Sequence, residues 1–268
     1  MIRIEYLEVQ YGRQPPALTI EQLSIKRGEC VAIIGPSGAG KSTLLRTIKG
    51  YVRPVHGKVE VMGVNLATAG RRDRMRVHRK VGVIYQQFHL ARRLTVLQNV
   101  LCGRLGQARF WGRLGSLVGW FSVEDRRQAW SAICEVGLRP QVHQRGDTLS
   151  GGEQQRVAVA RAVAQQPVII LADEPVSSVD PAWAEDLLAL LTDVQTHHQA
   201  TLVMSLHQPQ LARRFAHRII GLRQGRVVLD CDPASLTEVG LKELYRGSDV
   251  ISLDGTTSRP GTGRTRTA

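Results

Sequence analysis

The chain has 268 residues, 43% of them hydrophobic, which is ample for one large folded unit or two modest lobes. Its four cysteines lie far apart without a C-x-x-C pair, which argues against a disulfide framework or a zinc site built on cysteines. No apolar run approaches the ~20 residues that span a bilayer, and the N-terminus lacks a signal-peptide core, so we expect a soluble intracellular chain.

The formal net charge of +13 is concentrated in two stretches. Residues 71–80 and 256–268 together supply eight of these charges. A positive surface attracts nucleic acid, anionic lipid headgroups or acidic partner loops, whereas a solvated charged face needs no partner. The charge alone therefore selects none of these alternatives.

Strand-like apolar runs alternate with helical patterns along the chain. Residues 1–12 alternate like a strand, and further strands are predicted at 29–35, 56–63, 79–86, 167–175 and 200–207. Helical patterns cover 41–50, 94–103, 122–138, the segment after Ser150, and 181–198. Residues 218–230 predict a hairpin that turns at Gln224 and Gly225. This alternation predicts a mostly parallel α/β sheet.

The domain organisation follows from the same patterns. The helical block at about 88–165 is typical of a lobe inserted into the sheet core. From Gly255 onward, Gly, Thr, Ser, Pro and Arg dominate, which predicts disorder. We therefore expect one folded domain over 1–250 and a disordered tail over 251–268.

A phosphate-binding loop is predicted where a strand gives way to a helix. The sequence GPSGAGKST fits G-x-x-x-x-G-K-[S/T], and its glycines let backbone N–H groups point at phosphate oxygens. Lys41 would reach the β- and γ-phosphates of ATP, and the Ser42 hydroxyl would bind Mg²⁺. The residues of this P-loop are Gly35, Pro36, Ser37, Gly38, Ala39, Gly40, Lys41, Ser42 and Thr43.

Polar residues stand at the ends of three predicted strands. Asp173 would hold Mg²⁺ through water, and Glu174 would polarise the attacking water. His207 would reach a γ-phosphate oxygen, because strand ends of a parallel sheet converge on the ligand crevice. The amide of Gln86 would touch Mg²⁺ and the water. Tyr11, after the first strand, either stacks on adenine or is packed in the interior.

A second glycine pair raises a question about its ligand. Ser150 is a good N-cap residue, and Gly151 and Gly152 follow it at the start of a helix. Glycines at such a position let backbone N–H groups approach an anion. The chain already has a better phosphate site in its P-loop.

These motifs together resemble an ATP-binding-cassette nucleotide-binding subunit, over residues 1 to about 250. They occur in the order of that family: Tyr11, the P-loop, Gln86, LSGGE at 149–153, LADEP at 171–175, SSVD at 177–180, and His207. The resemblance implies a P-loop NTPase (RecA-like) core with an antiparallel β subdomain and an inserted helical subdomain. It implies an ATPase that uses ATP and Mg²⁺ and yields ADP and phosphate.

The resemblance also answers the question of the second glycine pair. In this family the LSGG helix start caps the γ-phosphate of ATP held by the P-loop of a second, head-to-tail subunit. Here Ser150, Gly151 and Gly152 would do so, and Asp180 would couple the two sites. Glu153 departs from the usual Gln, and its carboxylate should repel a polyphosphate unless it points away and caps the helix. Ser178 and Val179 replace the commoner Ala and Leu.

The family contains several kinds of protein. Chromosome ATPases carry a long coiled coil, but this sequence has no sustained heptads. Translation-associated proteins carry two cassettes in one chain, but this sequence has one P-loop. The sequence also shows no fused membrane domain, which fits an importer. The resemblance thus implies the motor of an importer at the cytoplasmic face of the inner membrane. Its partners would be transmembrane permease subunits and, indirectly, a substrate-binding protein, with no nucleic acid expected.

Two stretches resemble the ATPase subunit of phosphonate importers, which carry organophosphonates or phosphite. They are residues 84–106 and the aromatic-rich insert 109–130. The insert, with Phe110, Trp111, Trp120 and Phe121, either docks a permease helix or packs within the lobe. Cassettes for polar amino acids or lipoprotein release are the alternatives for the substrate.

Overall fold

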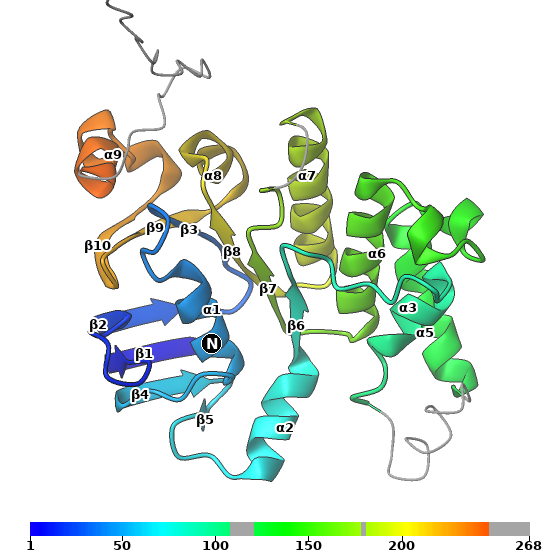
Figure 1. The fold of residues 1–268 in the computed structure, drawn as a ribbon, viewed down its shortest axis with the longest axis horizontal. Coiled ribbons are helices and arrows are strands. Elements are labelled where there is room, and N and C mark those ends of the chain that lie inside the picture. The colour runs from blue at the N-terminus through cyan, green and yellow to red at the C-terminus, as the bar shows by residue number, and fades with distance from the viewer. Residues whose placement is uncertain (108–120, 178–180, 247–268) are drawn as a thin grey trace, which may run out of the picture.

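The computed structural model describes residues 1–107, 121–177 and 181–246 (Figure 1). The strands are β1 (Ile2–Val9), β2 (Leu18–Ile25), β3 (Cys30–Ile34), β4 (His56–Val61), β5 (Val64–Asn65), β6 (Val81–Ile84), β7 (Ile169–Asp173), β8 (Thr201–Leu206), β9 (Arg218–Arg223) and β10 (Arg226–Cys231). The α-helices are α1 (Lys41–Lys49), α2 (Arg71–Lys80), α3 (Val96–Cys102), α5 (Val123–Glu135), α6 (Gly151–Ala164), α7 (Pro181–His197), α8 (Pro209–Phe215) and α9 (Glu238–Tyr245). Phe110, Trp111, Trp120, Asp180 and the predicted tail lie outside the described residues.

The larger sheet has six strands in the order β10-β9-β3-β8-β7-β6. Strands β9, β3, β8, β7 and β6 pair in parallel, and β10 returns antiparallel to β9. The smaller sheet is antiparallel, in the order β2-β1-β4-β5. This combination confirms the predicted mostly parallel α/β core with an antiparallel β part.

The central strands are buried on both faces. In β3, Cys30, Ala32 and Ile34 point into one core, while Val31 and Ile33 point into the other. The first core includes residues of α6 and α7, and the second includes residues of α1, β1 and β2. Such strands lack a polar face, which explains their continuous apolar sequence.

The hairpin predicted at 218–230 is present as β9 and β10. Gln224 and Gly225 have φ values of 49° and 75°, as expected for a tight two-residue turn. Helices α3, α5 and α6 pack against one another beside the sheet (Figure 1). The limits of 88 and 165 for an inserted lobe stay a prediction. Among the described residues, no helix combines the length and the apolar character needed to cross a bilayer.

Candidate functional site

The P-loop lies between the end of β3 and the start of α1. Gly35 has φ of 150°, and a Cβ atom there would stand 2.1 Å from the Leu222 carbonyl oxygen. Gly40 has φ of 101°, and its Cβ would stand 2.7 Å from a methyl group of Leu18. Both positions therefore require glycine. Helix α1 has no side-chain cap and no acidic residue in its first turn, so its N-terminal N–H groups are available to an anion.

Lys41 lies inside this loop. Its Nζ donates hydrogen bonds to the carbonyl oxygens of Gly35, at 2.9 Å, and Pro36, at 3.1 Å. The side chain is 4% exposed, and Nζ lies 4.0 Å from Oε1 of Glu174. Burial lowers the pKa of Lys41, and the nearby carboxylates of Glu174 and Asp173 oppose that shift. The loop thus holds an ammonium group close to two acidic side chains.

Oxygen atoms from three elements meet beside the P-loop. The hydroxyl of Ser42 donates to Oδ1 of Asp173 at 2.8 Å, and the hydroxyl of Ser205 donates to the same oxygen at 2.9 Å. Asp173 ends β7 and Ser205 lies opposite it on β8. A carboxylate and hydroxyls of this kind are the hard oxygen donors that Mg²⁺ prefers, so the donor set fits this ion.

Glu174 and His207 form the next pair along this edge. Nε2 of His207 lies 2.6 Å from Oε1 of Glu174. Glu174 has φ of 49°, an uncommon backbone conformation, and its N–H donates to the Ser205 hydroxyl at 2.8 Å. The predicted strand-end residues Asp173, Glu174 and His207 are therefore brought together with Lys41 and Ser42.

Gln86 and Tyr11 are two further residues that the sequence predicts for the nucleotide site, and both are exposed. Gln86 follows β6, which pairs with β7, and is exposed. Tyr11 follows β1 and is 42% exposed, which excludes the alternative that it is packed in the interior. Among the described residues, neither side chain makes a hydrogen bond or an ion pair with the P-loop.

The signature segment, LSGGE at 149–153, begins α6. Ser150 is the N-cap, and its N–H and hydroxyl both donate to Oε2 of Glu153 at 2.8 Å. These hydrogen bonds from Ser150 lower the pKa of Glu153. The Glu153 carboxylate is thus turned back to cap its own helix, one of the two orientations considered from sequence. Gly152 lies against the indole of Trp183, which is 54% exposed.

The signature segment and the P-loop are separate in this chain. In Figure 1, α1 lies to the left of strands β7 and β6, and α6 lies to their right. Within the described ranges, no hydrogen bond or ion pair joins residues 150–152 to residues 35–43. Asp180, which follows both segments in sequence, lies outside the described residues.

Sequence reasoning missed three residues that connect the elements of the site. Arg161 of α6 donates to the carbonyl oxygens of Phe88, at 2.5 Å, and His89, at 2.7 Å, in the loop after Gln86. Gln155 of α6 donates to the Pro175 carbonyl oxygen at 3.3 Å. Ser205 had a visible signal, because it is a polar residue in the otherwise apolar TLVMSL strand. Nothing in the local sequence marks the partners of Arg161 or Gln155.

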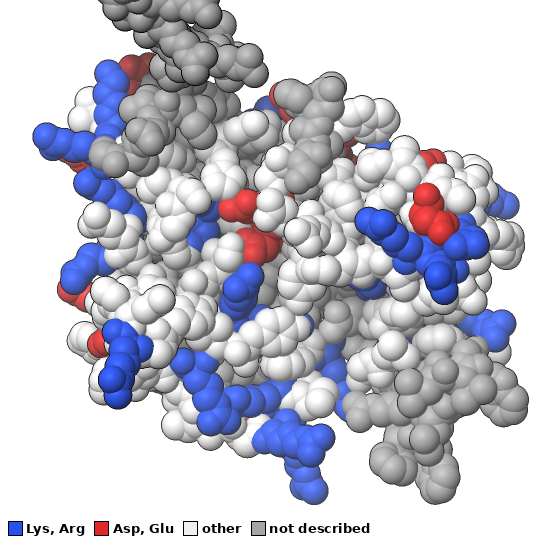
Figure 2. Space-filling model, viewed as in Figure 1, with Lys and Arg blue, Asp and Glu red and all other residues white. Residues whose placement is uncertain are grey.

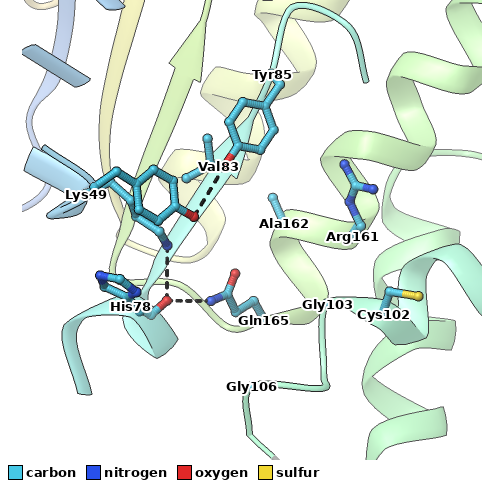
Figure 3. A pocket seen from close by; sticks show the side chains of 11 residues that line it. Lys49, His78, Val83, Tyr85, Cys102, Gly103, Gly106, Arg161, Ala162 and Gln165 are labelled. Carbon is cyan, nitrogen blue, oxygen red and sulfur yellow. Dashed lines mark hydrogen bonds between the residues drawn. The ribbon is translucent and has the colours of Figure 1, made fainter. Parts of the chain in front are cut away.

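A hollow of about 280 Å³ lies beneath the loop after β6 (Figure 3). Its walls come from the end of α1, from β6 and from α3 and α6. Gln165 donates to the His78 carbonyl oxygen at 2.8 Å, and Lys49 donates to the same oxygen at 3.1 Å. Burial lowers the pKa of Lys49 to about 8. Tyr85 and Tyr51 also line the hollow, and the hydroxyl of Tyr85 donates to that of Tyr51 at 3.4 Å.

The basic segment 71–80 forms helix α2, which buries only Val77 among its residues. Figure 2 shows Lys and Arg side chains gathered along the lower edge of this face, over α2. Arg71, Arg72, Arg76 and Lys80 are exposed. The local charge excess therefore lies on a solvent-facing helix.

Comparison with known proteins gives a consistent result. The family model described as ABC transporter matches residues 18–177. A phosphonates import ATP-binding protein PhnC of Thiobacillus denitrificans is 47% identical over 233 residues, which cover 86% of this chain and 88% of that protein. A phosphonates import ATP-binding protein PhnC 2 of Halalkalibacterium halodurans is 41% identical over 246 residues, which cover 92% of this chain and all of that protein.

Two solved structures of the cassette MJ0796 are also similar. The dimeric structure of this bacterial ABC transporter cassette is 34% identical with a TM-score of 0.75, covering 87% of this chain and 99% of that one. The dimeric post-hydrolysis structure bound to ADP and Pi is 33% identical with a TM-score of 0.74 and the same coverage. The curated and structural matches both extend over most of the chain.

Proposed function

The chain belongs to the ABC transporter family, and from this premise we propose that it hydrolyses ATP to drive an importer of phosphonates or a related phosphorus oxyanion. One observation carries the ATPase assignment. Lys41 and Ser42 of the P-loop converge with Asp173, Glu174 and His207 at the ends of two neighbouring strands. The reaction is ATP + H2O to ADP and phosphate.

The P-loop would bind the phosphates of ATP. Lys41 now donates to carbonyl oxygens of its own loop, and its ammonium group would turn to the β- and γ-phosphates. The glycine-lined turn and the uncapped start of α1 offer backbone N–H groups to the same anion. Tyr11, exposed beyond β1, would stack on the adenine ring.

Three residues would hold Mg²⁺ at this site. Ser42 and Asp173 already share a hydrogen bond, and Gln86 would add its amide oxygen. When bound, Mg²⁺ neutralises charge on the β- and γ-phosphate oxygens. The Ser205 hydroxyl keeps the Asp173 carboxylate oriented toward Ser42.

Glu174 and His207 would serve the hydrolytic step. The Glu174 carboxylate would accept a hydrogen bond from the attacking water and polarise it. His207 contacts the same carboxylate and would also reach the γ-phosphate. The hydrogen bond from the Glu174 N–H to the Ser205 hydroxyl holds the backbone of Glu174 in place, and so helps to position its carboxylate.

A second copy of the chain would complete each nucleotide site. The N–H groups of Gly151 and Gly152 and the positive end of α6 favour an anion, but they lie apart from the P-loop of the same chain. A head-to-tail dimer would place Ser150 and both glycines on the γ-phosphate held by the partner. The two similar MJ0796 structures are dimeric, which supports this arrangement. We also expect Asp180 to couple the two sites.

The hollow beneath the loop after β6 would receive side chains from a cytoplasmic helix of a permease subunit that docks over it. Its walls include α6, which begins with the signature segment, and β6, which leads to Gln86. Arg161 joins α6 to the loop after Gln86. A helix docked there would contact β6, which leads to Gln86 at the chain's own nucleotide. It would also contact α6, which begins at the signature segment proposed to bind the partner's nucleotide. The chain would thus work as a peripheral subunit at the cytoplasmic face of the inner membrane.

The substrate assignment rests on the relatives, which are named phosphonates import ATP-binding proteins. A permease would carry the phosphonate, and a substrate-binding protein would deliver it. None of the residues proposed for the nucleotide site is proposed to contact the cargo.

A growth experiment tests the whole proposal. Cells that lack the gene should fail to grow on a phosphonate as sole phosphorus source, and the wild-type gene should restore growth. The Lys41→Ala variant should not restore it, whereas Lys26→Ala, at an exposed lysine outside the site, should. Growth of all these strains on inorganic phosphate is the control. Normal phosphonate growth with Lys41→Ala would contradict the proposal.

The nucleic-acid alternative has its own test. A chain that binds DNA through α2 should show affinity that falls steeply with salt, because each phosphate contact releases counterions. We expect no retention of DNA on a filter at physiological salt. Tight binding lost in an Arg71→Ala, Arg72→Ala double variant would favour the alternative.

A further inference from the structure

A cluster of metal-binding side chains joins the ends of two helices away from the P-loop. Glu135 is the last residue of α5, His197 is the last residue of α7, and His198 follows it. Nδ1 of His197 lies 3.0 Å from Oε1 of Glu135. Nε2 of His198 lies 3.1 Å from Oε1 and 3.0 Å from Oε2 of the same carboxylate. Over residues 1–107, 121–177 and 181–246, this is the one group of three such residues whose ligand atoms lie within 4.8 Å of one another.

The spacing of these atoms is close to what zinc requires. Zinc bonds to imidazole nitrogen and carboxylate oxygen are about 2.0–2.2 Å long, which puts neighbouring ligand atoms of a tetrahedral site roughly 3.3–3.5 Å apart. The three nitrogen–carboxylate distances of 3.0–3.1 Å differ from this by a few tenths of an ångström, and the two imidazole nitrogens lie within 4.8 Å of each other. Small side-chain rotations would therefore suffice to admit the ion.

The donor set also selects the class of metal. Two imidazoles and one carboxylate suit zinc and neighbouring transition metals, whereas Mg²⁺ and Ca²⁺ prefer oxygen ligands alone. The cluster therefore differs in chemistry from the all-oxygen group formed by Ser42 and Asp173. An ion at one site would not substitute for an ion at the other.

The backbone beneath the cluster is held firmly. The N–H of His198 donates to the Val194 carbonyl oxygen at 3.0 Å, which continues the helical pattern by one residue. The buried side chain of Gln195 donates to the carbonyl oxygens of Gly28 and Ala200, each at 3.0 Å. On the α5 side, Ile133 is fully buried in the same core as Val194. The ligands thus extend from fixed helix ends.

Solvent reaches the cluster. The side chain of His197 is 74% exposed, that of His198 28% and that of Glu135 20%. An ion can enter without opening the fold, and a water molecule would complete the coordination. We propose that Glu135, His197 and His198 form a zinc site that ties the end of α5 to the end of α7.

An ion that binds only the folded chain stabilises it by RT ln(1 + [ion]/Kd), so stability rises with the ion concentration. The test uses the untagged, full-length protein without nucleotide, after removal of metals by a chelator. Zinc is titrated in competition with a chromophoric chelator, and thermal unfolding is followed with and without zinc. We expect one tightly bound equivalent and a higher unfolding temperature, and no rise with Mg²⁺.

Matched variants connect that result to the cluster. His198→Ala, His197→Ala and Glu135→Ala should each weaken zinc binding by more than about tenfold, since even loss of an outer-shell partner costs that much. Each should also remove the rise in unfolding temperature. His143→Ala, at an exposed histidine elsewhere, and Cys134→Ser, at the exposed thiol beside Glu135, should bind zinc as the wild type does.

Three results would overturn the inference. Wild-type protein that binds no zinc would mean that the cluster is a histidine–glutamate ion pair only. Unchanged binding in all three cluster variants would place the ion elsewhere. Loss of binding in Cys134→Ser alone would identify a thiolate site instead.

Discussion

Nε2 of His207 lies 2.6 Å from Oε1 of Glu174, and the same carboxylate oxygen lies 4.0 Å from Nζ of Lys41. One carboxylate therefore faces both the histidine after β8 and the lysine of the P-loop. The Ser205 hydroxyl, which receives the Glu174 N–H, also donates to Asp173. The groups proposed for metal binding and for hydrolysis are thus connected through one serine.

The first prediction concerns Glu174→Gln. The amide keeps the size of the side chain but is a poor proton acceptor, so it should not polarise water. We expect turnover to fall at least about 100-fold, because general base catalysis contributes that much or more. The measurements are phosphate release and equilibrium binding of MgATP, which should be retained. Turnover within twofold of wild type would refute the role, and Glu21→Gln, at an exposed position, is the control.

The second prediction concerns His207. Its loss removes the contact that positions the Glu174 carboxylate, and misplaced catalytic groups cost about 100-fold in rate. His207→Ala should therefore lower turnover by about this factor while MgATP still binds. His207→Gln can still donate to Glu174 and should recover part of the loss. Equal activity of the alanine variant and the wild type in steady-state assays would exclude a positioning role.

The third prediction concerns Tyr11. Stacking of a base on an aromatic ring is worth about 1–3 kcal/mol, so Tyr11→Ala should raise the Kd for MgATP about tenfold or more. Tyr11→Phe keeps the ring and should bind normally. Tyr6→Ala removes a tyrosine that is 79% exposed on β1 and serves as the control. Unchanged affinity of Tyr11→Ala would remove this residue from the nucleotide site.

The strands of the larger sheet were predictable because their burial leaves a direct trace in the sequence, whereas β2 of the smaller sheet was not predicted. β3 and β8 are buried at every position, and both are almost uninterrupted apolar runs. Helix α2 was not predicted, because only Val77 is buried and its basic residues show no apolar periodicity. The helix α8 was also missed, and its seven residues are too few for a clear period.

The candidate site was predictable in its motifs but not in its connections. The P-loop and the strand-end residues such as Asp173 carry their own sequence patterns. The contacts of Arg161 with Phe88 and His89 do not, because they join segments more than seventy residues apart. Both loop residues have positive φ values, 27° and 46°, and positive φ is usually indicated in a sequence by glycine, which is absent at these positions. Such contacts depend on how α6 packs, which the local sequence does not specify.

The fourth prediction concerns the capping box of α6. Hydrogen bonds from Ser150 hold the pKa of Glu153 below its ordinary value of 4.5. A carboxylate with a lowered pKa in the folded state stabilises the protein above the pKa of the unfolded chain, and this contribution is lost as pH falls through the lowered value. The difference in unfolding free energy between wild type and Glu153→Gln should therefore shrink between neutral pH and pH below about 4. Chemical denaturation at several pH values measures it, and a pH-independent difference would contradict the assignment.

The last prediction concerns an ion pair that links the segment just after α3 to α5 and α6. Nε of Arg104 lies 2.8 Å from Oδ1 of Asp125, and Nη1 donates to the Ala164 carbonyl oxygen at 2.9 Å. The Arg104 side chain is 8% exposed and that of Asp125 16%, so removing one partner leaves a charge largely out of water. Burial acts to raise the pKa of Asp125, but hydrogen bonds from Ser122 and Arg104 outweigh it and lower that pKa.

Arg104→Ala should therefore destabilise the fold by about 3 kcal/mol, as expected when half of a buried pair is removed. Asp125→Ala should cost a similar amount, because it leaves the guanidinium without its carboxylate. The double variant should cost clearly less than the sum of the two single changes, since neither charge then remains unpaired. Denaturant unfolding of the four proteins gives the coupling energy, with Arg127→Ala, in an exposed pair with Glu124, as the control for a surface contact. Additive effects would show that the two side chains stabilise the fold independently, Arg104 through contacts such as its hydrogen bond to Ala164.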